Sequence, residues 1–246
     1  MREFLVFRLY GPLASWGDIA VGEQRPTTPH PSKSAILGLV AAALGIRRDE
    51  EDRQQALAEG YGYAVRVDAS GVLLRDYHTT QIPDSTSRLK HLLTRRDETR
   101  DRQNLYTVLS TRDYRCEGLY TICLWLQDKI APSLEEIAAA LRTPHFPLYL
   151  GRKSCPLALP VHPRCVQAET FEEAFVHYDA EQPDLLKKFL LEHLKLLKAT
   201  NPDYYWDEHA PTKLTPLHTT PRQDNPLSRK RWQFGKRNEQ YARGKP

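Results

Sequence analysis

The order in which strand-like and helix-like segments follow one another limits this chain to few folds. Residues 3–10 alternate apolar side chains as a strand does. A helix then begins near Pro31 and Ser32 or Ser34 and ends at Gly45. The next elements are a hairpin of residues 63–67 and 72–78, a strand at 119–126, a helix opened by the capping box Ser133-x-x-Glu136, and a strand at 161–167. This β-α-β-β-α-β order predicts an α+β, ferredoxin-like domain, a class that includes the RNA-recognition fold.

A long segment after the predicted hairpin has too few large apolar residues to form a core. Residues 79–102 contain Pro83, many hydroxyl side chains, and cations interleaved with acids. This composition is typical of an arm that projects from a domain. The cations are Arg88, Lys90, Arg95, Arg96, Arg100 and Arg102.

The C-terminal part of the chain has a different composition. Residues 184–199 place leucines on one face and lysines around the other, which predicts an amphipathic helix. Such a face most often docks on its own domain, and binding of a partner protein is the alternative. Residues 213–246 hold nine lysines and arginines against two acids, so this segment carries +7 in a chain of net charge +4. A final strand is expected near 231–234. We therefore expect a ferredoxin-like domain at 1–168 and a C-terminal region at 169–246 that contains this helix and a basic tail.

Cysteine usage and hydropathy exclude several classes of protein. The four cysteines form no C-x-x-C pair and the N-terminus opens directly into a strand, so we expect a reduced, cytoplasmic protein. No window approaches the ~18 continuous apolar residues of a membrane span, so no membrane partner is expected. The nine histidines include no H-E-x-x-H motif and only a lone His162-x-x-Cys165, so neither a metal nor another cofactor is expected.

Two glycine-containing stretches carry the functional signal. Residues 11–17 read Gly-Pro-Leu-Ala-Ser-Trp-Gly, and residues 148–156 read Leu-Tyr-Leu-Gly-Arg-Lys-Ser-Cys-Pro. Each stretch places a glycine, which has no Cβ and lets the backbone approach a ligand closely, beside an aromatic ring. Taken alone, each is more often a tight turn whose ring packs in the core. Together they indicate a site for phosphates and bases, because the second stretch adds two cations and a hydroxyl.

Other donors are expected on the same face of the molecule. Lys33 and Ser34 lie at the predicted N-terminus of the first helix, where free N–H groups favour phosphate. Arg25 would reach this face from the preceding loop. Trp16 either stacks on a base or packs in the core, and the sequence does not decide between the two.

Six motifs follow one another along the chain: residues 9–17, the run Arg25-Pro26-Thr27 with 31–39, residues 74–79, Arg112-Asp113-Tyr114, residues 149–157, and Pro221-Arg222-Gln223. In type, order and spacing they resemble the type I-E members of the CRISPR-associated protein 5 family, subunits of the RNA-guided surveillance complex Cascade. The resemblance implies an RNA-recognition-like domain with a long β-hairpin thumb at about 79–112 and a smaller C-terminal β-rich part. The helix at 184–199 and the basic end beyond Trp232 exceed the family pattern, so the resemblance assigns them no role.

The resemblance also implies a function without catalysis. Members of the family hold the repeat-derived 5′ handle of the crRNA, cap the backbone filament next to the large PAM-reading subunit, and meet target DNA through the assembled complex. The partners implied are therefore crRNA, the Cascade backbone subunit and the large subunit. The residues expected to bind RNA are Trp16, Arg25, Lys33, Ser34, Arg75, His78, Arg88, Arg112, Tyr149, Gly151, Arg152, Lys153 and Ser154.

Two other functions remain open. Some relatives in other CRISPR subtypes cut precursor RNA, and a metal-independent endoribonuclease would need a general base and a cation. The side chains available for these roles are Tyr77, His78, Lys90 and His91, although a histidine in a strand is more commonly structural. The second alternative is an adaptor whose basic tail, residues 229–231 with 236–237, binds DNA without sequence specificity.

Overall fold

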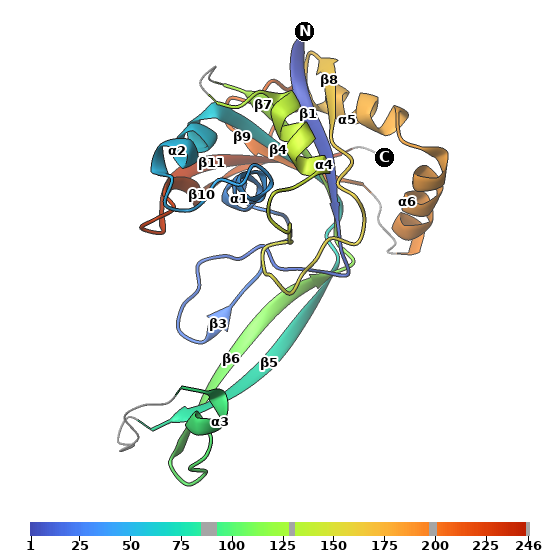
Figure 1. Cartoon of the computed structure of the whole chain (residues 1–246). Coiled ribbons are helices and arrows are strands. Elements are labelled where there is room, and N and C mark those ends of the chain that lie inside the picture. Colours follow the sequence, from blue (N-terminus) through green and yellow to red (C-terminus); the bar gives the residue numbers. More distant parts are fainter. Residues whose placement is uncertain (85–92, 128–130, 197–200, 245–246) are drawn as a thin grey trace.

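The computed structural model describes residues 1–84, 93–127, 131–196 and 201–244. One β-sheet forms the body of the molecule, and a second sheet runs out of the body as a long arm (Figure 1). Helices combined with antiparallel strands make this an α+β protein, as predicted. Among the described residues, no helix has the length and hydropathy that crossing a membrane requires.

The sheet of the body contains seven strands within the described residues, in the order β10-β11-β9-β4-β7-β1-β8. Each strand is antiparallel to its neighbours. The sequence predicted four of these strands, at 3–10, 63–67, 119–126 and 161–167, and the start of a fifth near 231–234. The seven are β1 (Arg2–Tyr10), β4 (Tyr61–Ala69), β7 (Leu119–Leu126), β8 (Arg164–Ala168), β9 (Asp203–Asp207), β10 (His218–Ser228) and β11 (Gln233–Arg243).

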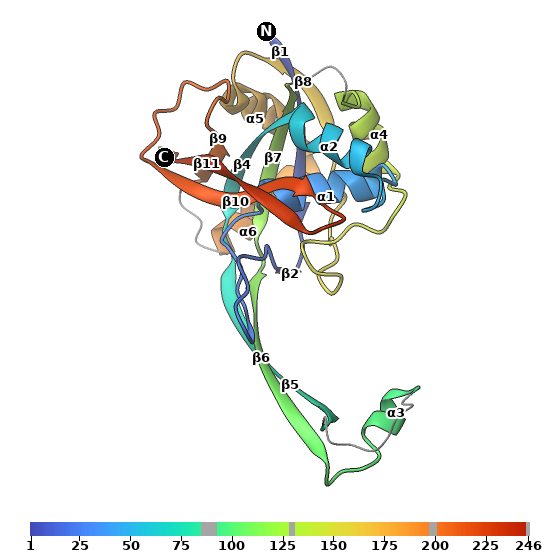
Figure 2. The same ribbon diagram turned by 90° about the vertical axis from the view of Figure 1, so that its left-hand side faces the viewer.

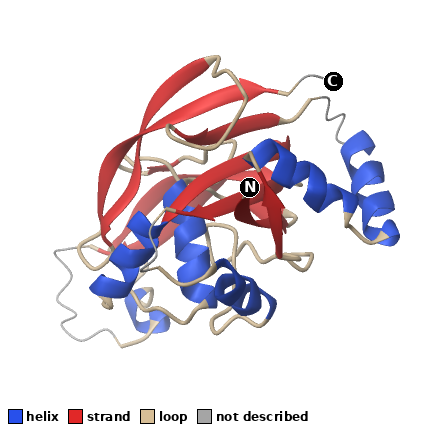
Figure 3. Ribbon diagram, turned by 90° about the horizontal axis from the view of Figure 1, so that it is seen from above, coloured by secondary structure: helices blue, strands red, loops and turns tan. Residues whose placement is uncertain are grey.

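Helices cover both faces of this sheet, as the view from above shows (Figure 3). Leu5, Phe7 and Leu9 of β1 belong to a core shared with α1 (Lys33–Ala43), α2 (Glu51–Gly60) and α4 (Leu134–Arg142). Phe4 and Val6 belong to a second core, shared with α5 (Phe171–Ala180). Because successive strand side chains point to opposite faces, both sets of β1 residues are buried.

Two of the predicted helices begin at the caps that the sequence indicates. Ser32 caps α1 by accepting a hydrogen bond from the amide of Ala35, and Ser133 with Glu136 forms the predicted capping box of α4. α5 was not predicted, although Thr170 caps it in the same way. α2 was also missed, because few of its side chains are apolar and buried.

The amphipathic helix α6 (Asp184–Leu196) docks on its own domain. Leu190 is buried together with Ala69 and Leu119. The ring of Tyr10, at the end of β1, lies 4.8 Å from the ring of His193 between centroids. Part of the apolar face of α6 therefore packs on the end of the sheet, the first of the two alternatives, while Phe189 remains 41% exposed. The last predicted helical residues, 197–199, lie outside the described residues.

The hairpin predicted from 63–67 and 72–78 is wrong, because these two segments belong to different sheets. β4 pairs with β7 and β9, whereas β5 (Val72–Pro83) pairs with β6 (Leu105–Cys116). The chain leaves the body sheet at Gly71, whose φ is +70°. A Cβ there would lie 2.3 Å from the carbonyl oxygen of Cys116, so this turn requires glycine.

The β5–β6 arm projects far from the body in both side views (Figures 1 and 2). Its register runs from Val72 opposite Cys116 to Pro83 opposite Leu105, so the hairpin is longer than the predicted 79–112. A short helix, α3 (Arg95–Glu98), lies near its end. At its base, β2 (Leu13–Ala14) and β3 (Gln24–Arg25) pair with β6, which anchors the arm to the body.

Residues beyond 168 extend the body sheet and form no sheet of their own within the described part of the chain. β9 pairs with β4, β11 pairs with β9, and β10 pairs with β11. The segment predicted as a basic tail at 213–246 is therefore largely a β-hairpin, up to the last described residue, 244. A tail was expected because the charge is dense there, but Arg237 is paired with buried carboxylates, as described below.

Candidate nucleic-acid interface

The two glycine stretches singled out from the sequence are in direct contact. The amide of Ser15 donates to the carbonyl of Leu150 at 3.0 Å. Gly151 has φ +85°, and a Cβ on it would lie 1.8 Å from the carbonyl oxygen of Ser15. The glycine is therefore needed for close approach to the chain itself, whereas the sequence suggested close approach to a ligand. We call residues 148–156 the glycine turn.

Arg152 of the glycine turn lies against the base of the arm. Its guanidinium carbon is 4.8 Å from the centre of the Tyr114 ring, and its Nη2 donates to the carbonyl of Arg25 at 3.1 Å. Its Nη1 is buried and has no hydrogen-bond partner among the described residues. A buried donor without a partner carries an energetic cost.

Three more of the predicted arginines gather at the same place. Arg25 in β3 is in register with Arg112 in β6. Arg75 in β5 makes a two-pronged ion pair with Asp113, at 2.9 and 3.1 Å. The hydrogen bonding of Arg75 lowers the pKa of Asp113, and the charge of Arg152 lowers this pKa further. We call Arg25, Arg75, Arg112 and Arg152 the arm-base arginines.

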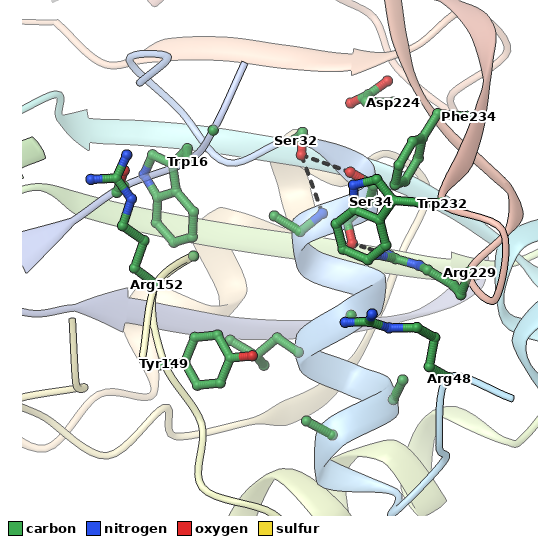
Figure 4. A pocket seen from close by; sticks show the side chains of 18 of the residues that line it. Trp16, Ser32, Ser34, Arg48, Tyr149, Arg152, Asp224, Arg229, Trp232 and Phe234 are labelled. Atoms are coloured by element: carbon green, nitrogen blue, oxygen red, sulfur yellow. Dashed lines mark hydrogen bonds between the residues drawn. The ribbon is translucent and has the colours of Figure 1, made fainter. Parts of the chain in front are cut away.

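A pocket of about 900 Å³ opens beside the arm-base arginines (Figure 4). It lies between the glycine turn, α1 and the turn that joins β10 to β11. The acids among its lining residues are Asp18 and Asp224, and its exposed aromatic rings include Tyr149 and Trp232. The arginines that line it are Arg25, Arg47, Arg48, Arg152, Arg222 and Arg229. We call it the arginine pocket.

Trp16 and Lys33, two of the residues expected to bind RNA, are buried, although Trp16 also borders the arginine pocket. Trp16 is 2% exposed and packs edge-on against Tyr120, so its ring is part of the core. Lys33 is also buried, and its Nζ lies 2.9 Å from a carboxylate oxygen of Asp207. Its backbone amide donates to Asp224, also at 2.9 Å. The N-terminus of α1 is therefore occupied by a carboxylate of the protein, in the position where we expected phosphate.

The other predicted residues divide between the pocket and its surroundings. Ser34 and Tyr149 line the pocket, and Tyr149 is 38% exposed. Lys153 and Ser154 are exposed on the glycine turn, next to the pocket but outside its lining. His78 lies on the arm opposite Ser110. Arg88 lies outside the described residues.

Sequence reasoning missed Arg48 and Trp232 as members of this site, and it assigned Arg229 to a free tail. Arg48 comes from the connection between α1 and α2, whereas Arg229 and Trp232 come from the turn between β10 and β11. The cluster of basic residues at 229–231 was a visible signal. Its position at the pocket depends on the order of strands in the sheet, which the sequence pattern does not reveal.

A buried ion network holds the C-terminal strands against α1. Its members are Lys33, Asp207, Asp224, Arg237 and Glu239. Arg237 contacts all three carboxylates, at 3.1 Å for Asp207 and 2.6 Å for Asp224 and Glu239. Burial alone would raise the pKa of Glu239, but the hydrogen bond and charge of His30 and the charge of Arg237 lower it to about 2.

One group of described residues brings three potential metal-ligating atoms together, outside the arginine pocket. Atoms of Glu3, Glu135 and Cys165 lie within 4.8 Å of one another. Burial, a hydrogen bond from Glu3 to Glu135 and the charge of Glu135 raise the pKa of Glu3.

Comparison with known proteins gives consistent matches along nearly the whole chain. A family model described as CRISPR-associated protein (Cas5) matches residues 4–238. The CRISPR system Cascade subunit CasD of Escherichia coli (strain K12) is 33% identical over 212 residues, covering 82% of this chain and 89% of that protein. A chain of a solved CRISPR RNA-guided surveillance complex has a TM-score of 0.65 and 23% identity, covering 98% of this chain and 90% of that chain. A crystal structure of a Cas protein has a TM-score of 0.56 and 25% identity, covering 98% and 94%.

Proposed function

The chain belongs to the Cas5 family of CRISPR-associated proteins, and we propose that it is a non-catalytic crRNA-binding subunit of a type I-E Cascade complex. In this role it holds the repeat-derived 5′ handle of the guide RNA and caps the backbone filament. It contacts the neighbouring backbone subunit and the large PAM-reading subunit, and meets target DNA through the assembled complex.

The observation that carries this proposal is the meeting of the glycine turn with the arm-base arginines. Arg152 has an unpartnered donor there among the described residues, and Arg25 and Arg112 bring further charge to the same place. A single RNA strand offers phosphates to such cations and bases to exposed rings such as that of Tyr149. Lys153 and Ser154 add exposed donors on the same turn.

The order of the body strands supports a ferredoxin-like, RNA-recognition-like assignment for the domain. Four neighbouring strands run β4-β7-β1-β8, and α1 and α4 lie between them in the chain. That is the β-α-β-β-α-β plan with its two helices on one face. We propose that the β5–β6 arm is the thumb of this fold and that it pins the guide RNA against the adjacent backbone subunit.

The glycine turn is testable by removing its two cations. We expect Arg152→Ala/Lys153→Ala to weaken handle binding by about 1–3 kcal/mol for each charge-assisted bond removed. The slope of log affinity against log salt should fall by about 0.7 for each phosphate of a single strand that the variant no longer neutralises. Both quantities are read from fluorescence anisotropy of labelled crRNA handle at several salt concentrations.

A matched control removes two cations elsewhere on the surface. Lys188 and Lys195 are exposed on α6, and neither lines the arginine pocket. Lys188→Ala/Lys195→Ala changes the net charge equally and should leave affinity and salt slope close to those of the parent. Equal losses in the two double variants would show that only net charge matters, and no loss in either would refute the assignment of the glycine turn.

The endoribonuclease alternative has little support from the arm. His78 is not among the residues that line the arginine pocket, and Lys90 and His91 lie outside the described residues. We expect His78→Ala to leave precursor processing by the complete complex intact. The purified chain should not cut a repeat hairpin, with or without metal. Specific cleavage that leaves a 2′,3′-cyclic phosphate and disappears in the variant would favour the nuclease instead.

A further inference from the structure

Two arginines on the wall of the arginine pocket away from the glycine turn have no counter-ion in the described part of the chain. Figure 4 shows Arg48 and Arg229 across α1 from Tyr149 and Arg152. Neither makes an ion pair with any acid among the described residues. Arg229 donates through Nη2 to the carbonyl of Ser34, while its buried Nε has no partner among those residues.

The charge of this pair is destabilising in the absence of an anion. Burial and the nearby charge of Arg48 lower the pKa of Arg229 to about 10. Arginine otherwise stays protonated, so the pair keeps both charges at neutral pH and the repulsion persists. Asp224 also lines the pocket, but Arg237 already neutralises it at 2.6 Å. A phosphate between the two guanidinium groups would compensate both charges and satisfy free donors.

An exposed aromatic ring completes this wall. Trp232 is 60% exposed, and the guanidinium carbon of Arg48 lies 4.7 Å from its ring centre. The Phe234 ring lies 5.5 Å away at 87°. Because Arg48 covers one face of the indole, the solvent-exposed surface of Trp232 lies largely on the other face. Trp232 also has φ +57°, a left-handed backbone conformation that is strained for a residue of this size.

We propose that Arg48, Arg229 and Trp232 form a second nucleotide subsite, in which the two guanidinium groups hold one phosphate and the free face of Trp232 stacks on one base of single-stranded RNA. The proposal rests on the proposed function, because it adds a contact to the same guide strand. A single strand fits this wall, because the faces of bases in a duplex are covered by their neighbours. With the glycine turn on the opposite wall, the strand would cross the arginine pocket over α1.

Intrinsic fluorescence reports mainly on this subsite, because Trp232 is the one exposed tryptophan among the described residues. The chain has four tryptophans, and Trp16, Trp125 and Trp206 are at most 2% exposed. We expect an unlabelled single-stranded RNA of about eight nucleotides to quench the emission of Trp232 by stacking. Trp232→Leu should remove the quenching, and Arg48→Gln should weaken RNA binding about tenfold.

Three variants serve as controls. Lys230→Gln and Arg231→Gln each remove one exposed charge from the same turn but leave the pocket lining unchanged, so their affinities should change less than about twofold. Arg152→Ala/Lys153→Ala should weaken binding while leaving the quenching at saturation intact. The thermal midpoint of each variant is measured alongside, to show that it is folded.

The outcomes separate this subsite from the proposed function. If RNA binds and depends on Arg152 and Lys153, but Trp232 is not quenched and Arg48→Gln binds normally, the subsite is wrong and the function stands. Equal quenching by double-stranded RNA would also overturn the subsite, because this wall would then bind duplexes. Equal quenching by polyglutamate would overturn it as well, because the wall would then bind acidic peptides. A parent chain that binds no RNA would overturn both.

Discussion

Arg237→Met lowers the free energy of unfolding by about 3–5 kcal/mol, the largest decrease that we expect from a single substitution in this chain. The substitution leaves Asp207, Asp224 and Glu239 buried without the cation that contacts all three. Lys33 remains beside Asp207 and His30 beside Glu239, but the ion pair of Asp224 with Arg237 is removed. Urea denaturation followed by circular dichroism measures this decrease.

The control for this prediction is the neighbouring residue. Lys236 is exposed, so Lys236→Met removes the same charge from the same strand, and we expect a change within about 0.5 kcal/mol. Arg237→Lys should recover part of the stability, because it restores the charge without the two-pronged geometry. If Arg237→Met were as stable as the parent, hydrophobic packing alone would hold β10 and β11 against α1.

Shortening the β5–β6 arm should abolish assembly with the guide while leaving the body folded. The change replaces residues 80–108 by an Asn-Gly turn between Thr79 and Leu109, which face each other in the register. No described residue in 80–108 belongs to the buried cores, so the thermal midpoint should stay within about 2 °C of the parent. Co-expression with the backbone subunit and crRNA, followed by size-exclusion chromatography, measures assembly.

A shorter deletion locates the part of the arm that matters. Replacing residues 85–102 by a Gly-Ser linker keeps the paired strands up to Pro83 and Leu105. Failure of both variants to assemble would assign the interaction to the end of the arm, and failure of the longer deletion alone would assign it to the paired strands. An insoluble longer variant would show that the arm supports the core, and normal assembly of both would show that the thumb is dispensable.

The parts of the site that the sequence predicted are those whose chemistry is local. The glycine turn was singled out because charged, aromatic and glycine residues stand side by side in the chain. Arg25 and Arg112 are far apart in sequence, and the sequence placed both at the site only through their motifs. Their register on β3 and β6 then brings them together. The assignment of Lys33 as a phosphate ligand failed because Asp207 and Asp224, nearly two hundred residues away, reach it first.

By itself, the sequence determined the elements whose signals lie within a few residues. The alternation of β1 and β7 and the caps at Ser32 and Ser133 are set by side-chain direction and by nearby hydrogen bonds, so they can be identified without the rest of the chain. Only the tertiary structure decided which strands pair and which cations stay free. β5 pairs with β6 rather than β4, and the C-terminal hairpin buries Arg237 while presenting Arg229 and Trp232 to the pocket. Strand pairing and charge compensation depend on residues far apart in the chain, which compete for partners only after the chain has folded.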